Sequence, residues 1–405
     1  MKILVAENEA LTESQIDEID AEPQSISGVL VLDDDERVVC YPSEWLTALT
    51  HLQDLTYKTA VTYARNISYF IDFLGSRPEF FGLDADQMLL RVNRSLLEDW
   101  VINQQEDVCL DRTTVRNREG CLRSFYTYLS DNERRNAVLE KSPFPSKYLS
   151  AKPHVKQVVS ASLDELVSLM NECKHERERL LLQFMYDSGL RISEVERVTF
   201  GHIQNAIKFT NSGFVSSKAK NAPARPGYAP LLILGSKGRG NSIKERHAIV
   251  TLPTLKRIST YHSSPLYRRY QRRYQDKGQC PAFLNTVGDP YNEESLAKMI
   301  KRRSDSALRK KLISKKVHAH LFRHGSAYLT LQDPNLGGDF LDRLVNVQKT
   351  LGHSFISTTE RYTSVPHDIY DSIADSNFGA LKTKIEKMEA VVERTKLKIR
   401  PGDKK

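Results

Sequence analysis

Residues 318–329 read HAHLFRHGSAYL, and their spacing places three basic side chains on one helical face. His320, Arg323 and His324 stand at i, i+3 and i+4, which are neighbouring positions on an α-helix. Two histidines also suggest a metal site, but no H-E-x-x-H motif occurs and no carboxylate is interleaved with them. Each of these residues alone fits an ordinary core or surface position, so the meaning of the stretch depends on the rest of the chain.

Two earlier stretches also present basic residues next to glycines. In SGLRISEVERV (188–198), Gly189 ends a helix and Arg191 follows in the turn. In LGSKGRGN (234–241), the glycines do not match the nucleotide-binding pattern G-x-x-x-x-G-K-[ST]. This second stretch is better interpreted as a hairpin tip that presents Lys237.

The stretch LGHSFISTTERYTSVP (351–366) places a tyrosine on a short helix. Ser357 and Glu360 have capping-box spacing, which starts a helix that carries Tyr362. Pro366 disfavours helical geometry at the preceding residue and ends that helix. We expect Tyr362 to sit on about two turns with a loop on each side, although a partly buried structural tyrosine is the simpler alternative.

The charge of the chain is unevenly distributed. Of the net +8 of the 405 residues, residues 1–45 contribute −10, from twelve acidic and two basic side chains, so the remainder carries +18. A basic body of this size favours a polyanionic partner, most simply nucleic acid, although a basic surface alone has the same composition.

The sequence excludes several other classes of protein. The apolar runs are too short to cross a bilayer, and the first residues lack the pattern of a signal peptide. The five cysteines are scattered without a C-x-x-C pair, which argues for a reducing compartment and against a structural zinc site. We expect a cytoplasmic, nucleoid-associated protein that binds no metal and no membrane.

Hydrophobic periodicity predicts a mainly α protein with a small β-sheet. YAPLLILGSKGRG and KERHAIVTLP are the expected hairpin arms, and SGVLVLDDDERVVCYP resembles two strands around an acidic turn. We expect an acidic N-terminal extension, a helical domain, a linker broken by prolines, a mixed α/β domain and a C-terminal tail helix. Their expected bounds are 1–45, 46–131, 132–160, 161–365 and 366–405.

Basic side chains are concentrated on two expected helices of the region 46–131. A helix with many arginines can follow phosphates or enter a major groove, although a solvated amphipathic helix is more common in general. The candidate DNA-binding residues are Lys58, Arg65, Arg112, Arg116, Arg118 and Arg123.

The combined pattern resembles the tyrosine recombinase family, also called the phage integrase family. G-L-R-x-S-E appears here as GLRISE, H-x-x-R-H as HLFRH, and L-G-H-S…T…Y as LGHSFISTTERY. The resemblance covers residues 160–365, and residues 45–131 are similar to the helical core-binding domain of that family. The catalytic residues that it implies are Arg191, Lys237, His320, Arg323, His353 and Tyr362.

The chain departs from the family pattern at a few points. Phe322 stands where leucine is usual, and extra residues around DPNLGGDF lengthen the segment between Arg323 and His353. The hairpin is also longer than usual. Lys237 is the preferred hairpin lysine because of its glycine context, and Lys244 is its rival.

The resemblance implies a helical core-binding domain, a mixed α/β catalytic domain and a mechanism without ATP, metal or another cofactor. Arg191 and Arg323 hold the phosphate, His353 donates a hydrogen bond, and Tyr362 attacks to form a 3′-phosphotyrosine. His320 is the implied proton acceptor for the phenol, and Lys237 the implied acid for the 5′ oxygen. Glu194 is expected to orient this constellation.

The sequence therefore predicts a site-specific DNA recombinase, an integrase or transposase of a mobile element. A Xer-like chromosome dimer resolvase is the nearest alternative, followed by a type IB topoisomerase and a catalytically silent DNA-binding regulator. The expected partners are double-stranded recombination sites and further copies of the chain, as a tetramer on DNA.

The tail contains an apolar stripe at helical spacing, and its Lys384 belongs to the polar remainder of that helix. The stripe either folds back on its own domain or docks on the neighbouring protomer. The residues of the stripe are Leu381, Ile385, Met388 and Val392.

Overall fold

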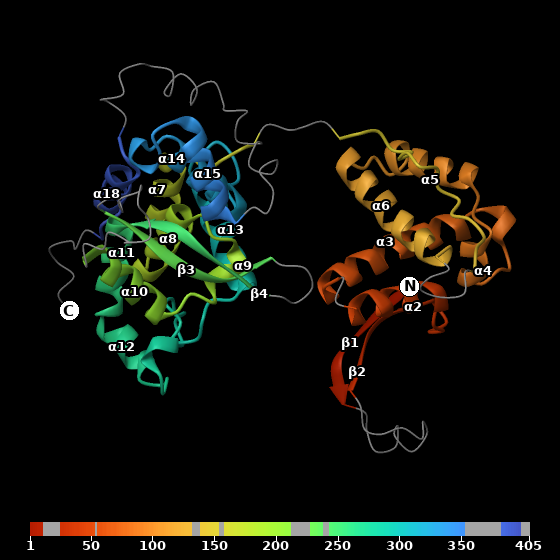
Figure 1. Cartoon of the computed structure of the whole chain (residues 1–405), viewed down its shortest axis with the longest axis horizontal. Coiled ribbons are helices and arrows are strands. Elements are labelled where there is room, and N and C mark those ends of the chain that lie inside the picture. The colour runs from red at the N-terminus through yellow and green to blue at the C-terminus, as the bar shows by residue number, and fades with distance from the viewer. Residues whose placement is uncertain are drawn as a thin grey trace. The chain divides into compact units, whose positions relative to one another are not determined.

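The computed structural model describes residues 1–10, 25–52, 55–131, 138–153, 158–211, 227–237, 243–352 and 382–397. The chain forms two compact units, one within residues 1–156 and one from residue 157 onwards (Figure 1). The prediction of a mainly α fold with little β-sheet is confirmed. None of the helices in the described ranges combines the length and the apolarity that a membrane span requires.

The first unit begins with a small antiparallel sheet and a helix. β1 (Lys2–Ala10) pairs with β2 (Ser25–Leu32), and α2 (Cys40–His51) packs against β2. The acidic turn after β2 is held by the Asp33 carboxylate, which accepts the backbone N–H groups of Asp35 and Arg37. The strand predicted after this turn is reduced to one bridge, between Leu32 and Val38, because α2 begins almost at once.

In the described residues of the first unit, four more helices and a short 3₁₀ turn follow α2. They surround an aromatic core in which Trp45 lies 5.4 Å from Phe125, and Phe70 lies 5.3 Å from Trp100, between ring centroids. Side chains of Thr56, Asp84, Asn93 and Asp111 cap the helix N-termini. The elements are α3 (Tyr57–Gly75), η1 (Pro78–Phe80), α4 (Ala85–Leu90), α5 (Arg94–Glu106) and α6 (Arg112–Leu129).

Over its described residues, the second unit combines helices with a β-hairpin. Its first four helices are α7 (Leu163–Asn171), α8 (Glu176–Ser188), α9 (Ile192–Val195) and α10 (Phe200–Asn211). The hairpin β3 (Tyr228–Lys237) and β4 (Ile243–Thr251) is followed by α11 (Leu252–His262), α12 (Pro265–Gln271), η2 (Lys277–Gln279) and α13 (Glu293–Arg309). The described part of the chain then continues with α14 (Ala319–Leu331), η3 (Pro334–Leu336), α15 (Phe340–Leu351) and α18 (Lys384–Arg394).

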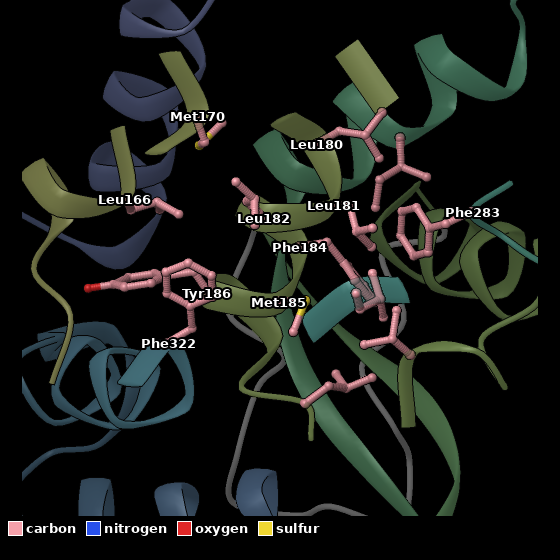
Figure 2. Close-up of a cluster of buried hydrophobic side chains, with 14 of the residues drawn as sticks. Leu166, Met170, Leu180, Leu181, Leu182, Phe184, Met185, Tyr186, Phe283 and Phe322 are labelled. Carbon is pink, nitrogen blue, oxygen red and sulfur yellow. The ribbon is translucent and has the colours of Figure 1, made fainter. Parts of the chain in front are cut away.

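α8 forms the centre of the second core. Nearly every residue of this helix is buried, and its side chains meet those of several other elements, as Figure 2 shows. Phe184 packs on Phe283 at 4.9 Å, and Tyr186 meets Phe322 edge-on at 5.9 Å. Phe322 therefore fills a core position, which accounts for an aromatic residue at this place in the sequence.

The β3–β4 hairpin confirms the predicted pair of arms. The strands are antiparallel, with Ile233 opposite Arg246 and Lys237 opposite Ile243. A register shift separates Ile233 from Ser236, which faces Lys244. Both candidate lysines therefore stand near the tip of the same hairpin.

α18 packs on the second unit of its own chain in this structure. Met388 and Val391 join the main core, and the helix contacts α11. Its buried face is also formed by Lys384, so the assignment of Lys384 to the polar face was wrong. The reason is a partner far away in sequence, because the Lys384 ammonium lies 3.2 Å from the buried carboxylate of Asp187 on α8.

Candidate active site

A glycine corner between α8 and α9 sets the direction of the chain at Arg191. Gly189 adopts a left-handed conformation with φ of 64° at the end of α8. A Cβ at this position would stand 2.9 Å from Leu351 and 3.0 Å from Ser326, so a side chain has no room. The corner places Arg191 at the N-cap of α9.

Glu194 forms ion pairs with two arginines next to this turn. Its buried carboxylate accepts the backbone N–H of Arg191 at 2.8 Å and the Arg191 guanidinium at 3.0 Å. Arg246 on β4 donates at 2.5 Å to Oε2, the oxygen that also accepts the Arg191 backbone N–H. The side chain of Arg191 stays 32% exposed whereas that of Arg246 is only 6% exposed. Arg191 is thus held at one edge and open to solvent at the other.

Arg323, which lies on α14, connects three segments of the second unit by hydrogen bonds. Its guanidinium donates to the carbonyl of Gly189 at 2.7 Å and also to the carbonyl of Leu351. Arg323 is almost fully buried, and Ser326 on the same helix donates to the Asp187 carbonyl at 3.0 Å. The end of α8, the start of α14 and the end of α15 are therefore fixed against one another.

His320 lies one turn before Arg323 on the same helix and keeps contact with solvent. Its ring stands 4.2 Å from that of His324, at a steep interplanar angle. Partial burial lowers the pKa of His320, and the positive charges of Arg323, His318 and Arg191 lower it further. A neutral imidazole near pH 7 can accept a proton.

The structure describes only some of the predicted catalytic residues. It brings together Arg191, Glu194, His320 and Arg323. The backbone of Lys237 ends β3, and nothing is described of its side chain. His353, Tyr362 and the predicted capping box lie outside the described residues. Within the described ranges, no group of three His, Cys, Asp or Glu residues is arranged to hold a metal ion.

Several predicted DNA-binding residues of the first unit have partners inside the unit. Arg123 donates to the buried Glu119 at 3.0 Å and to the carbonyl of Pro145 at 2.8 Å. Arg116 donates to the carbonyl of Ser150 at 2.9 Å and stacks on Tyr148. These arginines hold the segment that follows α6 against that helix.

Glu119, on the buried face of α6, also holds this segment in place. Its carboxylate accepts the backbone N–H of Leu149 at 2.7 Å and that of Ser150 at 2.8 Å. Because the carboxylate is fully buried, these charge-assisted hydrogen bonds are short and unscreened.

The other basic candidates of this unit divide into two kinds. Arg118 lies over the ring of Tyr69 at 4.1 Å and donates to Gln104, and partial burial lowers its pKa. The remaining three have exposed side chains on α3 and α6, where a duplex can reach them: Lys58, Arg65 and Arg112.

The sequence interpretation missed Arg246, which the structure places beside Glu194. A signal was present in the alternation of β4, because Arg246, Ala248 and Val250 are all buried. Period-two alternation assigns an arginine in such a series to the core face of its strand. A buried arginine needs a carboxylate partner, and that requirement points to Glu194.

Residues 160–367 match the phage integrase family. The tyrosine recombinase XerC of Listeria welshimeri is 28% identical over 263 residues, which cover 63% of this chain and 72% of that protein. XerC of Listeria innocua is 26% identical over 322 residues, covering 73% of this chain and 91% of the relative.

Solved structures show the same fold at low sequence identity. A XerH recombinase bound to a palindromic difH substrate, in a post-cleavage complex, aligns with a TM-score of 0.55 and 18% identity. That alignment covers 84% of this chain and 85% of the other. The Tn1549 transposon integrase in complex with transposon right end DNA aligns with a TM-score of 0.52 and 16% identity, over 82% and 96% of the two chains.

Proposed function

Because the chain belongs to the phage integrase family of DNA-cleaving and rejoining enzymes with a tyrosine nucleophile, we propose that it recombines specific DNA sites through Tyr362. The observation that carries this proposal is the grouping of two guanidinium groups with a histidine of lowered pKa. Such a group suits a phosphodiester, which gains negative charge on its non-bridging oxygens as it is attacked.

Each residue has a distinct part in the proposed reaction. The Tyr362 oxygen attacks phosphorus, and the bond from phosphorus to the 5′ oxygen breaks. The phenol proton passes to His320, and Lys237 gives a proton to the departing 5′ oxygen. Arg191 and Arg323 hold the non-bridging oxygens. A proton transfer of either kind contributes about 10²–10⁴-fold.

The resulting 3′-phosphotyrosine keeps the energy of the broken ester. A 5′-hydroxyl of a second strand attacks the phosphorus, the tyrosyl oxygen leaves, and the strands are rejoined without hydrolysis. His353 donates a hydrogen bond to the phosphate in both directions of this exchange.

We propose that the substrates are the ends of a mobile element. The acidic N-terminal extension and the long tail favour this assignment, because chromosome dimer resolvases are usually more compact. The similarity to XerC favours the resolvase as the second candidate. Footprinting on the DNA that flanks the gene separates them, since an integrase protects a site at the element boundary and a resolvase a chromosomal site elsewhere.

The assembly that we propose is a tetramer on two duplexes. The exposed Lys58, Arg65 and Arg112 supply phosphate contacts from the helical core-binding domain. In the assembled tetramer, α18 leaves the unit of its own chain and docks on the neighbouring protomer. Each active site is thereby connected to the next.

Tyr362→Phe tests the proposed chemistry. The variant retains the ring and is expected to bind the DNA site with unchanged affinity, but to form no covalent adduct with a nicked suicide substrate. The adduct is detected as a protein–DNA band that survives denaturing electrophoresis. Tyr328→Phe, on a buried tyrosine of α14, is the matched control and is expected to form the adduct. A full yield of adduct from Tyr362→Phe would exclude this residue as the nucleophile.

A further inference from the structure

We infer that Arg246 is a positioning residue for this reaction, which holds the Glu194–Arg191 pair and the end of α15 in their working geometry. The inference rests on the proposed function of the site. It adds a residue that touches neither the nucleophile nor the phosphate but fixes the groups that do.

Arg246 joins three segments of the site through one guanidinium. One nitrogen donates to Glu194 Oε2 at 2.5 Å, and another donates to the carbonyl of Thr350 at the end of α15. Its backbone lies on β4, opposite Ile233. A planar guanidinium with separate donors can hold both partners at once, which the single ammonium of a lysine cannot do in the same geometry.

The contact with Glu194 determines how much positive charge Arg191 presents. A carboxylate paired with Arg191 alone would cancel most of the field that attracts a phosphate. Arg246 shares that carboxylate, so the group of three residues retains a net charge of +1. Burial lowers the pKa of Arg246, and the charge of the Glu194 carboxylate offsets part of this decrease.

The contact with Thr350 fixes the point from which the chain continues to His353. The last carbonyls of a helix have no partner within the helix. Here Arg246 satisfies the carbonyl of Thr350, and Arg323 satisfies that of Leu351. Two arginines from different elements therefore hold consecutive carbonyls of α15, directly before the left-handed Gly352.

The test compares Arg246→Met and Arg246→Lys with the wild-type chain in single-turnover cleavage of the nicked suicide substrate. We expect the rate constant of adduct formation to fall about 10²-fold in both, because a displacement of about 1 Å has this effect on a positioned reaction. The dissociation constant for the DNA site is expected to stay within about threefold, since phosphate contacts elsewhere dominate affinity.

Arg179→Met is the matched control. Arg179 is equally buried and also donates to two backbone carbonyls, those of Cys173 and Thr395, away from Arg191. If Arg246 only stabilises the fold, Arg246→Met and Arg179→Met both reduce the fraction of substrate that forms the adduct, because less protein is folded. The rate constant of adduct formation is then unchanged in both. That outcome, or a wild-type rate constant in Arg246→Lys, overturns the inference. An absence of adduct with the wild-type chain overturns the proposed function instead.

Discussion

The buried Lys384 gives a prediction about stability that can be worked out from its contacts. Its ammonium donates to the Asp187 carbonyl at 2.6 Å and lies 3.2 Å from the Asp187 carboxylate, and neither side chain is exposed. Removing one partner of a buried ion pair costs about 3–5 kcal/mol because the other charge is left unpaired. Thr251 continues to donate two hydrogen bonds to Asp187, so we expect the lower end for Lys384→Met, about 3 kcal/mol.

Urea denaturation of the full chain, followed by a probe of the catalytic unit, measures this loss. For a unit of this size about 3 kcal/mol corresponds to a fall in melting temperature of about 6–12 °C. Lys382→Met makes the same substitution at an exposed position two residues earlier, before the helix begins, and it is expected to change the free energy of unfolding by less than about 0.5 kcal/mol.

A double variant isolates the unpaired charge as the cause. Asp187→Asn, added to Lys384→Met, removes the uncompensated carboxylate and is expected to recover part of the lost free energy. A loss below about 1 kcal/mol for Lys384→Met would refute the reasoning, since removing a fully buried, paired ammonium should lower the free energy of unfolding by more than this.

Three further predictions concern other parts of the chain. Burial lowers the pKa of His262 to about 4, so the unfolded chain binds a proton there below about pH 6.5 and the folded chain does not. The stabilisation that comes from the neutral ring is therefore complete above about pH 6.5. It declines by about 3 kcal/mol as the pH falls to about 4. The free energy of unfolding of His262→Phe, measured by denaturation, should not show this decline. Glu119→Gln weakens the attachment of residues 149–150 to α6, and limited proteolysis should cut this segment faster while the helical unit stays folded; an unchanged rate of cutting would contradict the attachment. A 5′-bridging phosphorothioate needs no acid to leave, so it should rescue Lys237→Ala and leave Arg191→Ala inactive; rescue of Lys244→Ala in place of Lys237→Ala would assign the acid to the rival lysine.

The sequence predicted those features that depend on short-range spacing. The i, i+3 spacing placed His320 and Arg323 on one helix, and α14 carries both. Ser162 and Glu165 have the S-x-x-E spacing of a capping box, and the structure forms one there. Such features follow from the geometry of a single turn of helix, which a sequence expresses directly.

Features that depend on distant partners were not predictable in the same way. Lys384 is buried because Asp187 lies 197 residues earlier in the chain and still reaches its ammonium. Arg123, a candidate for DNA binding, donates to the carbonyl of Pro145, in a segment that the sequence assigns to the linker. In each case a polar side chain took a partner that no local pattern identifies.

The attachment of residues 149–150 to α6 shortens the connection between the two units. The chain is fixed at Ser150 by Glu119 and again at Ala161, whose N–H donates to the Leu321 carbonyl at 3.0 Å. The eleven steps between these points extend to at most about 40 Å. At 3.4 Å per base pair this reach corresponds to about a dozen base pairs. A protomer that binds one duplex with both units therefore keeps Ser150 and Ala161 within little more than one helical turn of each other, so the connection between the units, rather than either unit, sets how far apart along the duplex these two anchor points can stand.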